Sequence, residues 1–291
     1  MTTPVLWTLD DLCAAADEGV AWLANVGIAR RGTRFEKYSD ILAAITPASL
    51  DDSGHEFVKE VFIGIVSLFW MSRAGIEHDP GVRDRLRLMV QGRAGDAETA
   101  YSAPWDAQFE LLCLAIARIA QFPRVLFAEP DLLLAFRTAK YGLPIKRLTS
   151  DKPRGWQERV KHGVGQLDRV GVQGIVIVEA AWPGLDTVPE LADALDQAAA
   201  IGVRSADRFV PGHRLDGVVM IRLHAAWRTT PQHVPYGLFA MRARFRSHNM
   251  TGEVSREFES VLSMIAGGLM HRLSMERPGE NISRAAPFVS R

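Results

Sequence analysis

Three polar segments in the middle of the chain carry residue types that could hydrolyse a phosphate ester. The first is Glu129-Pro130-Asp131, the second runs from Gly142 to Arg147 and contains Lys146, and the third is a basic segment containing Gln166. Asp131 opens one predicted strand and Lys146 lies inside the next. A carboxylate that faces a lysine on the adjoining strand could hold a divalent metal beside a cation that orients water or stabilises charge on a phosphate.

The elements before these segments are predicted to be helical. Thr8 and Ser53 each begin a capping box, and an apolar stripe at helical spacing follows each of them. The stripe after Ser53 contains Phe62, Ile65, Phe69 and Trp70, and is typical of helix packing or of a dimer contact. A third helix is predicted over residues 84–89, followed by a Gly-rich linker over 92–102.

The rest of the chain mixes strands with helices, which indicates an α/β layer structure. A helix over 104–121 places Glu110 beside its apolar stripe, where the carboxylate could point over the edge of a sheet. The later elements are strands at 124–127, 131–137, 141–148, 174–180, 217–227 and 237–247, and helices at 153–170, from Thr187 to about 201, and at 253–273. We therefore predict a helical N-terminal domain over 1–100, an α/β domain over 103–275 and a C-terminal tail over 276–291.

Composition and charge define the class of protein. The chain has 291 residues, with 34 Lys plus Arg, 34 Asp plus Glu and two Cys, which excludes disordered, collagenous and disulfide-rich classes. Residues 1–100 contain 15 acids and 10 bases, a net charge of −5, so residues 101–291 carry +5. The start has no signal-peptide pattern, and the longest apolar run, 61–71, is too short to span a membrane. These features predict a cytoplasmic protein that does not enter a membrane.

The Asp131, Lys146 and Gln166 segments, in their order of elements, resemble the PD-(D/E)XK nuclease superfamily. The resemblance covers about seventy residues, from Phe109 to Glu179. Within it, the sequence is also similar to uncharacterised bacterial members of the superfamily. It implies a restriction-endonuclease-like αβββαβ core with a mixed central sheet. It also implies a Mg²⁺-dependent or Mn²⁺-dependent phosphodiester hydrolase of DNA processing or defence, with DNA favoured over RNA as the substrate.

The resemblance also implies the site residues. Asp131 would bind metal, Lys146 would be catalytic, and the subset that resembles Holliday-junction resolvases adds Glu110 and Gln166. The sequence departs from the family at Pro144, where the second acid of the motif should stand two residues before the lysine. Three other acids could replace this metal ligand, namely Glu110, Glu129 and Glu158.

Basic residues near the predicted site indicate a surface for a nucleic-acid backbone. Residues 137–172 contain nine bases and three acids, a local charge of +6, and the strand 237–247 places arginines at alternate positions. The candidate nucleic-acid-binding residues are Lys140, Arg147, Lys152, Arg154, Arg159, Lys161, Arg242, Arg244 and Arg246. The alternative interpretation of the strand arginines is the soluble face of an amphipathic sheet.

Structural interpretations compete with each functional one. Glu129-Pro130-Asp131 is also a common turn tripeptide, and Lys146 could be a solvated strand end. Gln166 and Glu158 fit a polar helix face equally well, and Trp156 and Trp182 are expected in the core rather than stacked on bases. The alternative function is an inactive nuclease fold that binds nucleic acid or a partner. A homodimer or protein contact through the helical N-terminal domain is a further alternative.

Overall fold

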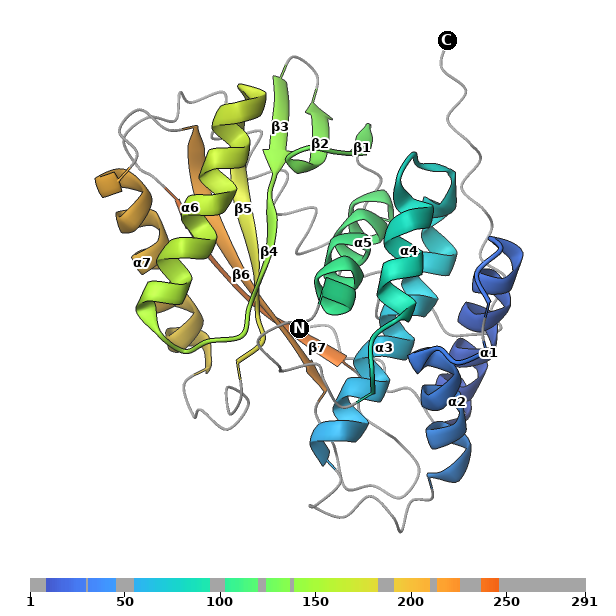
Figure 1. The fold of residues 1–291 in the computed structure, drawn as a ribbon. Helices are drawn as coiled ribbons and strands as arrows, with labels where there is room; N and C mark the ends of the chain where they lie inside the picture. Colours follow the sequence, from blue (N-terminus) through green and yellow to red (C-terminus); the bar gives the residue numbers. More distant parts are fainter. Residues whose placement is uncertain are drawn as a thin grey trace.

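One mixed sheet with helices on both faces forms the described part of this α/β protein (Figure 1). The structure, a computed structural model, describes residues 9–29, 31–45, 55–94, 103–119, 124–136, 139–182, 191–209, 214–225 and 237–245. The helices are α1 (Leu9–Asn25), α2 (Arg34–Ala44), α3 (His55–Ala74), the 3-10 helix η2 (Ile76–His78), α4 (Val82–Val90), α5 (Ala103–Ile119), α6 (Pro153–Val170) and α7 (Leu191–Phe209). The strands are β1 (Val125–Ala128), β2 (Asp131–Phe136), β3 (Ala139–Leu143), β4 (Ile145–Leu148), β5 (Gln173–Ala180), β6 (Leu215–Ala225) and β7 (Gly237–Phe245).

The N-terminal helices pack against one another, α3 and α4 also pack against α5, and α3 contacts the sheet at β6 and β7 (Figure 1). Helices α1, α3 and α4 occupy the predicted positions, whereas α2 was not predicted. Thr33 caps α2, because its Oγ1 accepts a hydrogen bond from the backbone N–H of Glu36 at 3.3 Å. The apolar stripe of α3 is fully buried, as helix packing requires, with exposed fractions of 3% for Phe62 and 0% for Trp70.

A hydrophobic core continues from these helices onto one face of the sheet. It contains side chains of α1, α3 and α5 together with Val219, Ile221 and Leu223 of β6. A second core lies on the other face, where α6 and α7 cover β5 and β6. Trp182 belongs to this second core, as predicted, and the partly buried Trp156 packs against that core with its ring centroid 5.7 Å from that of Trp182. The boundary between the predicted domains 1–100 and 103–275 stays a prediction.

The strand order is β1-β2-β3-β5-β6-β7, and β4 pairs with β5 beyond the end of β3. Strands β1, β2 and β3 form an antiparallel meander, β5 runs parallel to β3, β4 and β6, and β7 is antiparallel to β6. The predicted single strand at 141–148 is therefore two strands that meet at Pro144. Proline has no N–H group to donate, so the ladder between this strand and β2 cannot continue through it.

Helix α7 is longer than predicted, since it continues to Phe209 rather than ending near 201. The predicted Thr187 cap, the helix at 253–273 and the tail at 276–291 lie outside the described residues. No helix in the described part of the chain is long and apolar enough to cross a membrane. Both cysteines, Cys13 and Cys113, are free thiols.

Candidate active site at the fork of the sheet

The sheet divides into two branches beside Asp131. Strand β2 pairs with β3 as far as the partners Leu132 and Leu143, and β4 then continues alone along β5 from Ile145. The carbonyl of Pro144 still accepts a hydrogen bond from the N–H of Ile177 at 2.9 Å, so β5 stays paired while β2 separates. Asp131, as the first residue of β2, lies where the two branches part.

The carboxylate of Asp131 is held by three donors. Its Oδ2 accepts hydrogen bonds from the backbone N–H of Ile145 at 2.7 Å and from Nζ of Lys146 at 2.8 Å. Its Oδ1 accepts a hydrogen bond from Nε2 of Gln166 at 3.2 Å. The backbone of Asp131 has a φ of 127°, in a region that residues other than glycine rarely adopt. Such a conformation persists where the surroundings determine it, and it is concentrated at functional sites.

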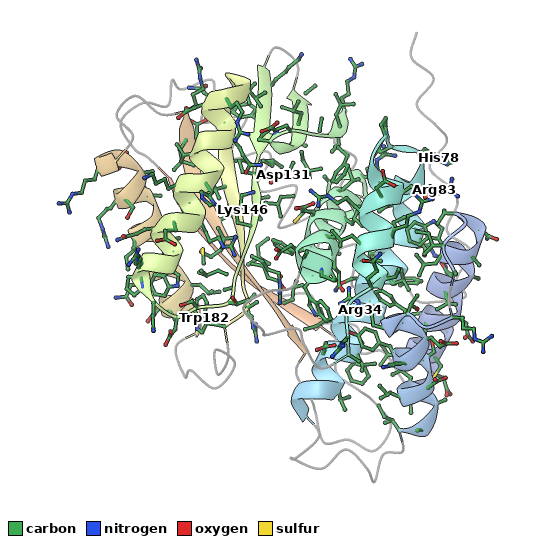
Figure 2. All side chains as sticks on the ribbon, in the orientation of Figure 1. Arg34, His78, Arg83, Asp131, Lys146 and Trp182 are labelled. Carbon is green, nitrogen blue, oxygen red and sulfur yellow. The ribbon has the colours of Figure 1, made fainter. Side chains whose placement is uncertain are left out.

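Lys146 lies close to the carboxylate and largely out of water. The side chains of Lys146 and Asp131 are only 14% and 13% exposed. The Nζ also donates to the carbonyl oxygen of Ile145 at 2.8 Å. The ammonium is therefore bound by two oxygens, one from each branch of the fork, as the sequence predicted for Asp131 and Lys146. Figure 2 labels both residues on the two branches.

Helix α6 brings Gln166 to the same point. The absence of a side chain at Gly163, one turn earlier, allows close packing, because a Cβ there would lie 2.6 Å from Cγ2 of Val176. Nε2 of Gln166 donates its hydrogen bond to Asp131, whereas Oε1 of the same side chain is buried and has no hydrogen-bond donor in the described residues. A buried acceptor without a partner is costly, so this oxygen requires an explanation.

Glu110 approaches from α5, on the opposite face of the sheet from α6. Burial is the main cause that raises the pKa of its carboxyl to about 7; Arg85 lowers the pKa, and the negative charge of Asp131 also contributes to raising it. Nε of Arg85 lies 3.1 Å from Oε2 of Glu110, yet this oxygen also has no hydrogen-bond donor in the described part of the chain. Two acceptor oxygens without donors therefore belong to the surroundings of Asp131, one from each helix layer.

The other two candidate metal ligands point elsewhere. Glu129 is half-exposed and pairs with Arg169 of α6 at 3.0 Å. Glu158 is exposed and pairs with Arg154 one turn away at 3.0 Å. Glu158 also precedes Gln166 by eight residues, about 12 Å along the helix axis. In the described ranges no group of three or more His, Cys, Asp or Glu side chains could hold a metal ion.

The candidate nucleic-acid-binding residues divide into exposed and buried ones. Arg147 is buried and forms an ion pair with Glu179 of β5 at 2.6 Å, so its charge does not reach the surface. Arg242 and Arg244 lie on β7 in register with Met220 and Val218, and Arg246 falls outside the described residues. Exposed or half-exposed positions on β3 and around α6 are occupied by Lys140, Lys152, Arg154, Arg159 and Lys161.

Comparison with known proteins gives no relative. No family model, no curated protein and no solved structure matches this chain. The function must therefore be inferred from the geometry of the fork itself.

Sequence reasoning missed two charged residues near the fork. Glu179 ends a strand of apolar residues, and a single acid in such a strand is a recognisable signal for a buried partner, here Arg147. Arg85, which contacts Glu110, lies in a helix segment with Arg83 and Arg87, and no pattern distinguishes it from them.

The residues at the fork fit a hard divalent cation. Mg²⁺ and Mn²⁺ prefer carboxylate and amide oxygens, and these ligand types are present here, because Gln166 is hydrogen-bonded to Asp131 and the charge of Asp131 acts on Glu110. The two acceptor oxygens without donors, Oε1 of Gln166 and Oε2 of Glu110, are of the type that such an ion binds. Lys146 would then keep its position on Oδ2 of Asp131.

Proposed function

We propose that this protein is a metal-dependent phosphodiester hydrolase of the PD-(D/E)XK type that acts on nucleic acid, with DNA favoured over RNA. One observation carries the proposal: a largely buried Asp131–Lys146 pair is flanked by two acceptor oxygens that lack donors. A purely structural ion pair between Asp131 and Lys146 does not account for the two oxygens, one of which, Oε2 of Glu110, has only the ionic contact with Arg85. A bound Mg²⁺ or Mn²⁺ accounts for both.

The order of elements around the pair supports the same proposal. Helix α5 is followed by β1, β2, the interrupted strand β3–β4, helix α6 and β5. This order agrees with the αβββαβ core that the resemblance implies when β3 and β4 are counted as one strand. In the proposed function, Asp131 and Lys146 would correspond to the acid and the lysine on these strands, and Glu110 and Gln166 lie on the helices before and after them.

Each residue has a role in the proposed reaction. Asp131, Glu110 and Gln166 would hold the ion, which when bound polarises a phosphoryl oxygen and lowers the pKa of water. Lys146 would orient the attacking water through Nζ or neutralise the charge that develops on the phosphate. The exposed cations Lys140, Lys152 and Lys161 would attract the backbone to this side of the molecule.

The test is cleavage of duplex and single-stranded DNA in Mg²⁺ and Mn²⁺. We expect Asp131→Asn and Lys146→Met to lower the rate by about 100-fold or more, the range for removing a group that acts on the transition state. Asp151→Asn and Lys37→Met change the same residue types at exposed positions remote from the fork, and should retain activity. Cleavage that persists in both fork variants at the control rate would contradict the proposed mechanism.

A second function is favoured by Pro144. The proline removes an acid that the family uses for metal, and no group of three acidic or metal-binding residues exists in the described ranges. The same fold would then be a binding module for nucleic acid or for a protein partner, without hydrolysis. Salt-dependent DNA binding by wild-type protein, with no cleavage in either metal, would support this alternative and exclude the first.

A further inference from the structure

Arg85 connects the helical part of the chain to the candidate active site. It lies on α4, which packs along α5, and its side chain is 41% exposed. Its Nε is 3.1 Å from Oε2 of Glu110, a side chain that is only 11% exposed. The cation therefore lies between solvent and a buried acid of the fork.

The contact between Arg85 and Glu110 is a weak one. Oε2 of Glu110 has no hydrogen-bond donor in the described residues, so the approach of Nε is an ionic contact without hydrogen-bond geometry. Arginine binds most strongly when two of its N–H groups reach two oxygens in parallel. A half-exposed guanidinium in a single contact is also screened by water. Such a side chain can exchange its partner at little cost.

We propose that Arg85 is the phosphate-binding residue of this site, held by Glu110 in the metal-free protein and transferred to the substrate phosphate when a divalent cation takes Glu110. The inference rests on the proposed hydrolase function, because it requires the metal. A divalent cation on Glu110 would repel the guanidinium, whose Nε lies 3.1 Å from Oε2, and we expect this repulsion to displace Arg85 from the carboxylate. The planar donors of arginine match the oxygens of a phosphodiester, which would arrive at the same place.

The neighbouring arginine provides a matched control. Arg87 lies on the same helix, is 54% exposed, and pairs with Asp84 at 2.9 Å rather than with a residue of the fork. Loss of either arginine removes one positive charge from α4, but only Arg85 competes with a cation for Glu110. An effect common to both variants would be an effect of net charge alone.

The first measurement is the affinity for Mn²⁺ without nucleic acid, detected by electron paramagnetic resonance. The proteins compared are wild type, Asp131→Asn, Arg85→Ala, Arg85→Gln and Arg87→Ala. We expect Arg85→Ala and Arg85→Gln to bind Mn²⁺ about two- to fivefold more tightly than wild type, the size of a partly exposed ion pair, and Arg87→Ala to be unchanged. Arg85→Gln keeps most of the side-chain packing, so tighter binding in both variants also excludes a folding artefact. Equal or weaker binding in both Arg85 variants would overturn the inference.

The second measurement is binding of a phosphorothioate duplex in Mn²⁺ at several salt concentrations. Arg85→Ala should reduce the slope of log affinity against log salt by about one unit, the change expected for one lost phosphate contact, whereas Arg85→Lys should keep the slope. An unchanged slope in Arg85→Ala would refute the phosphate contact while leaving the hydrolase proposal intact. Equal Mn²⁺ binding by wild type and Asp131→Asn would instead refute the metal site, and with it both proposals.

Discussion

Replacing Asp131 by alanine should destabilise the protein through the groups that it leaves behind. The carboxylate accepts hydrogen bonds from the N–H of Ile145, Nζ of Lys146 and Nε2 of Gln166, and the side chains of Asp131 and Lys146 are less than 15% exposed. In the variant, an ammonium stays largely buried without its counter-charge and a backbone donor loses its acceptor. The carbonyl of Ile145 still binds the ammonium and reduces the loss.

The magnitude follows from these contacts. Removing one partner of a buried ion pair costs about 3–5 kcal/mol, and the 13–14% exposure of this pair favours the lower end of that range. The variant Asp131→Ala should therefore lower the free energy of unfolding by about 3 kcal/mol. The double variant Asp131→Ala with Lys146→Met has no unpaired charge, so it should be destabilised less than the sum of the single variants by about 2 kcal/mol. The strained backbone at residue 131 is common to the single and double variants and cancels in this cycle.

Urea unfolding followed by tryptophan fluorescence measures these differences. The matched control is Glu158→Ala, which breaks an exposed pair with Arg154 and should cost less than about 1 kcal/mol. A cost for Asp131→Ala as small as that of the control, with no coupling to Lys146, would show that the carboxylate is solvated. The convergence of the fork, on which the proposed site depends, would then be wrong.

Three further predictions concern charges in or near the fork. Glu110 has a pKa of about 7 in the folded protein, above the usual 4.5, so wild type loses stability as the pH rises between these two values. Glu110→Gln has no such charge to bury and should therefore be more stable than wild type by about 2–3 kcal/mol at pH 8.5. In urea unfolding this gain should disappear near pH 4, and a gain that is independent of pH would contradict it. Glu179→Gln leaves Arg147 buried without its counter-charge and should cost about 3 kcal/mol or more by the same method, whereas Glu158→Gln should cost little. Pro144→Glu places a carboxylate on the face of Lys146, so scanning fluorimetry should show a lower unfolding midpoint without metal and a larger rise with Mn²⁺ than in wild type. An equal rise in both proteins would show that position 144 does not face the metal site.

The sequence predicted most of the elements because their periods are strong. The apolar stripe of α3 and the β-branched strand β5 each have one clear pattern, and both elements lie where that pattern predicted them. Helix α2 was missed although Thr33 and Glu36 have the spacing of a capping box, since its apolar residues are few. The fork was not predicted either, because the alternation of apolar and polar residues along a strand does not indicate where its hydrogen bonds to the neighbouring strand end. Only the missing N–H of Pro144 marked that position.

The candidate site was predicted in part, and its failures have a common physical cause. Asp131, Lys146 and Gln166 converge because strand order and helix position follow from local sequence. Glu129 and Glu158 were considered as metal ligands on spacing alone, but each has an arginine within reach and lies on a half-exposed or exposed surface. The burial of a carboxylate depends on packing between segments that are distant in the sequence. The contact of Arg85 with Glu110 depends on such packing too. A single sequence does not contain that information in local form.

The core that spans the helices and the sheet sets an order of events during synthesis. Buried residues of α1 and α3 share their core with Val219, Ile221 and Leu223 of β6, which leave the ribosome some two hundred residues after the first helix. At roughly 5–20 residues per second, the helices wait about ten seconds or more before this surface is covered. During that interval the part of α3 that packs against β6 has no sheet to cover it, although α1 and α5 are already synthesised. Efficient production of this protein should therefore depend on chaperones that bind the nascent N-terminal helices until β6 arrives.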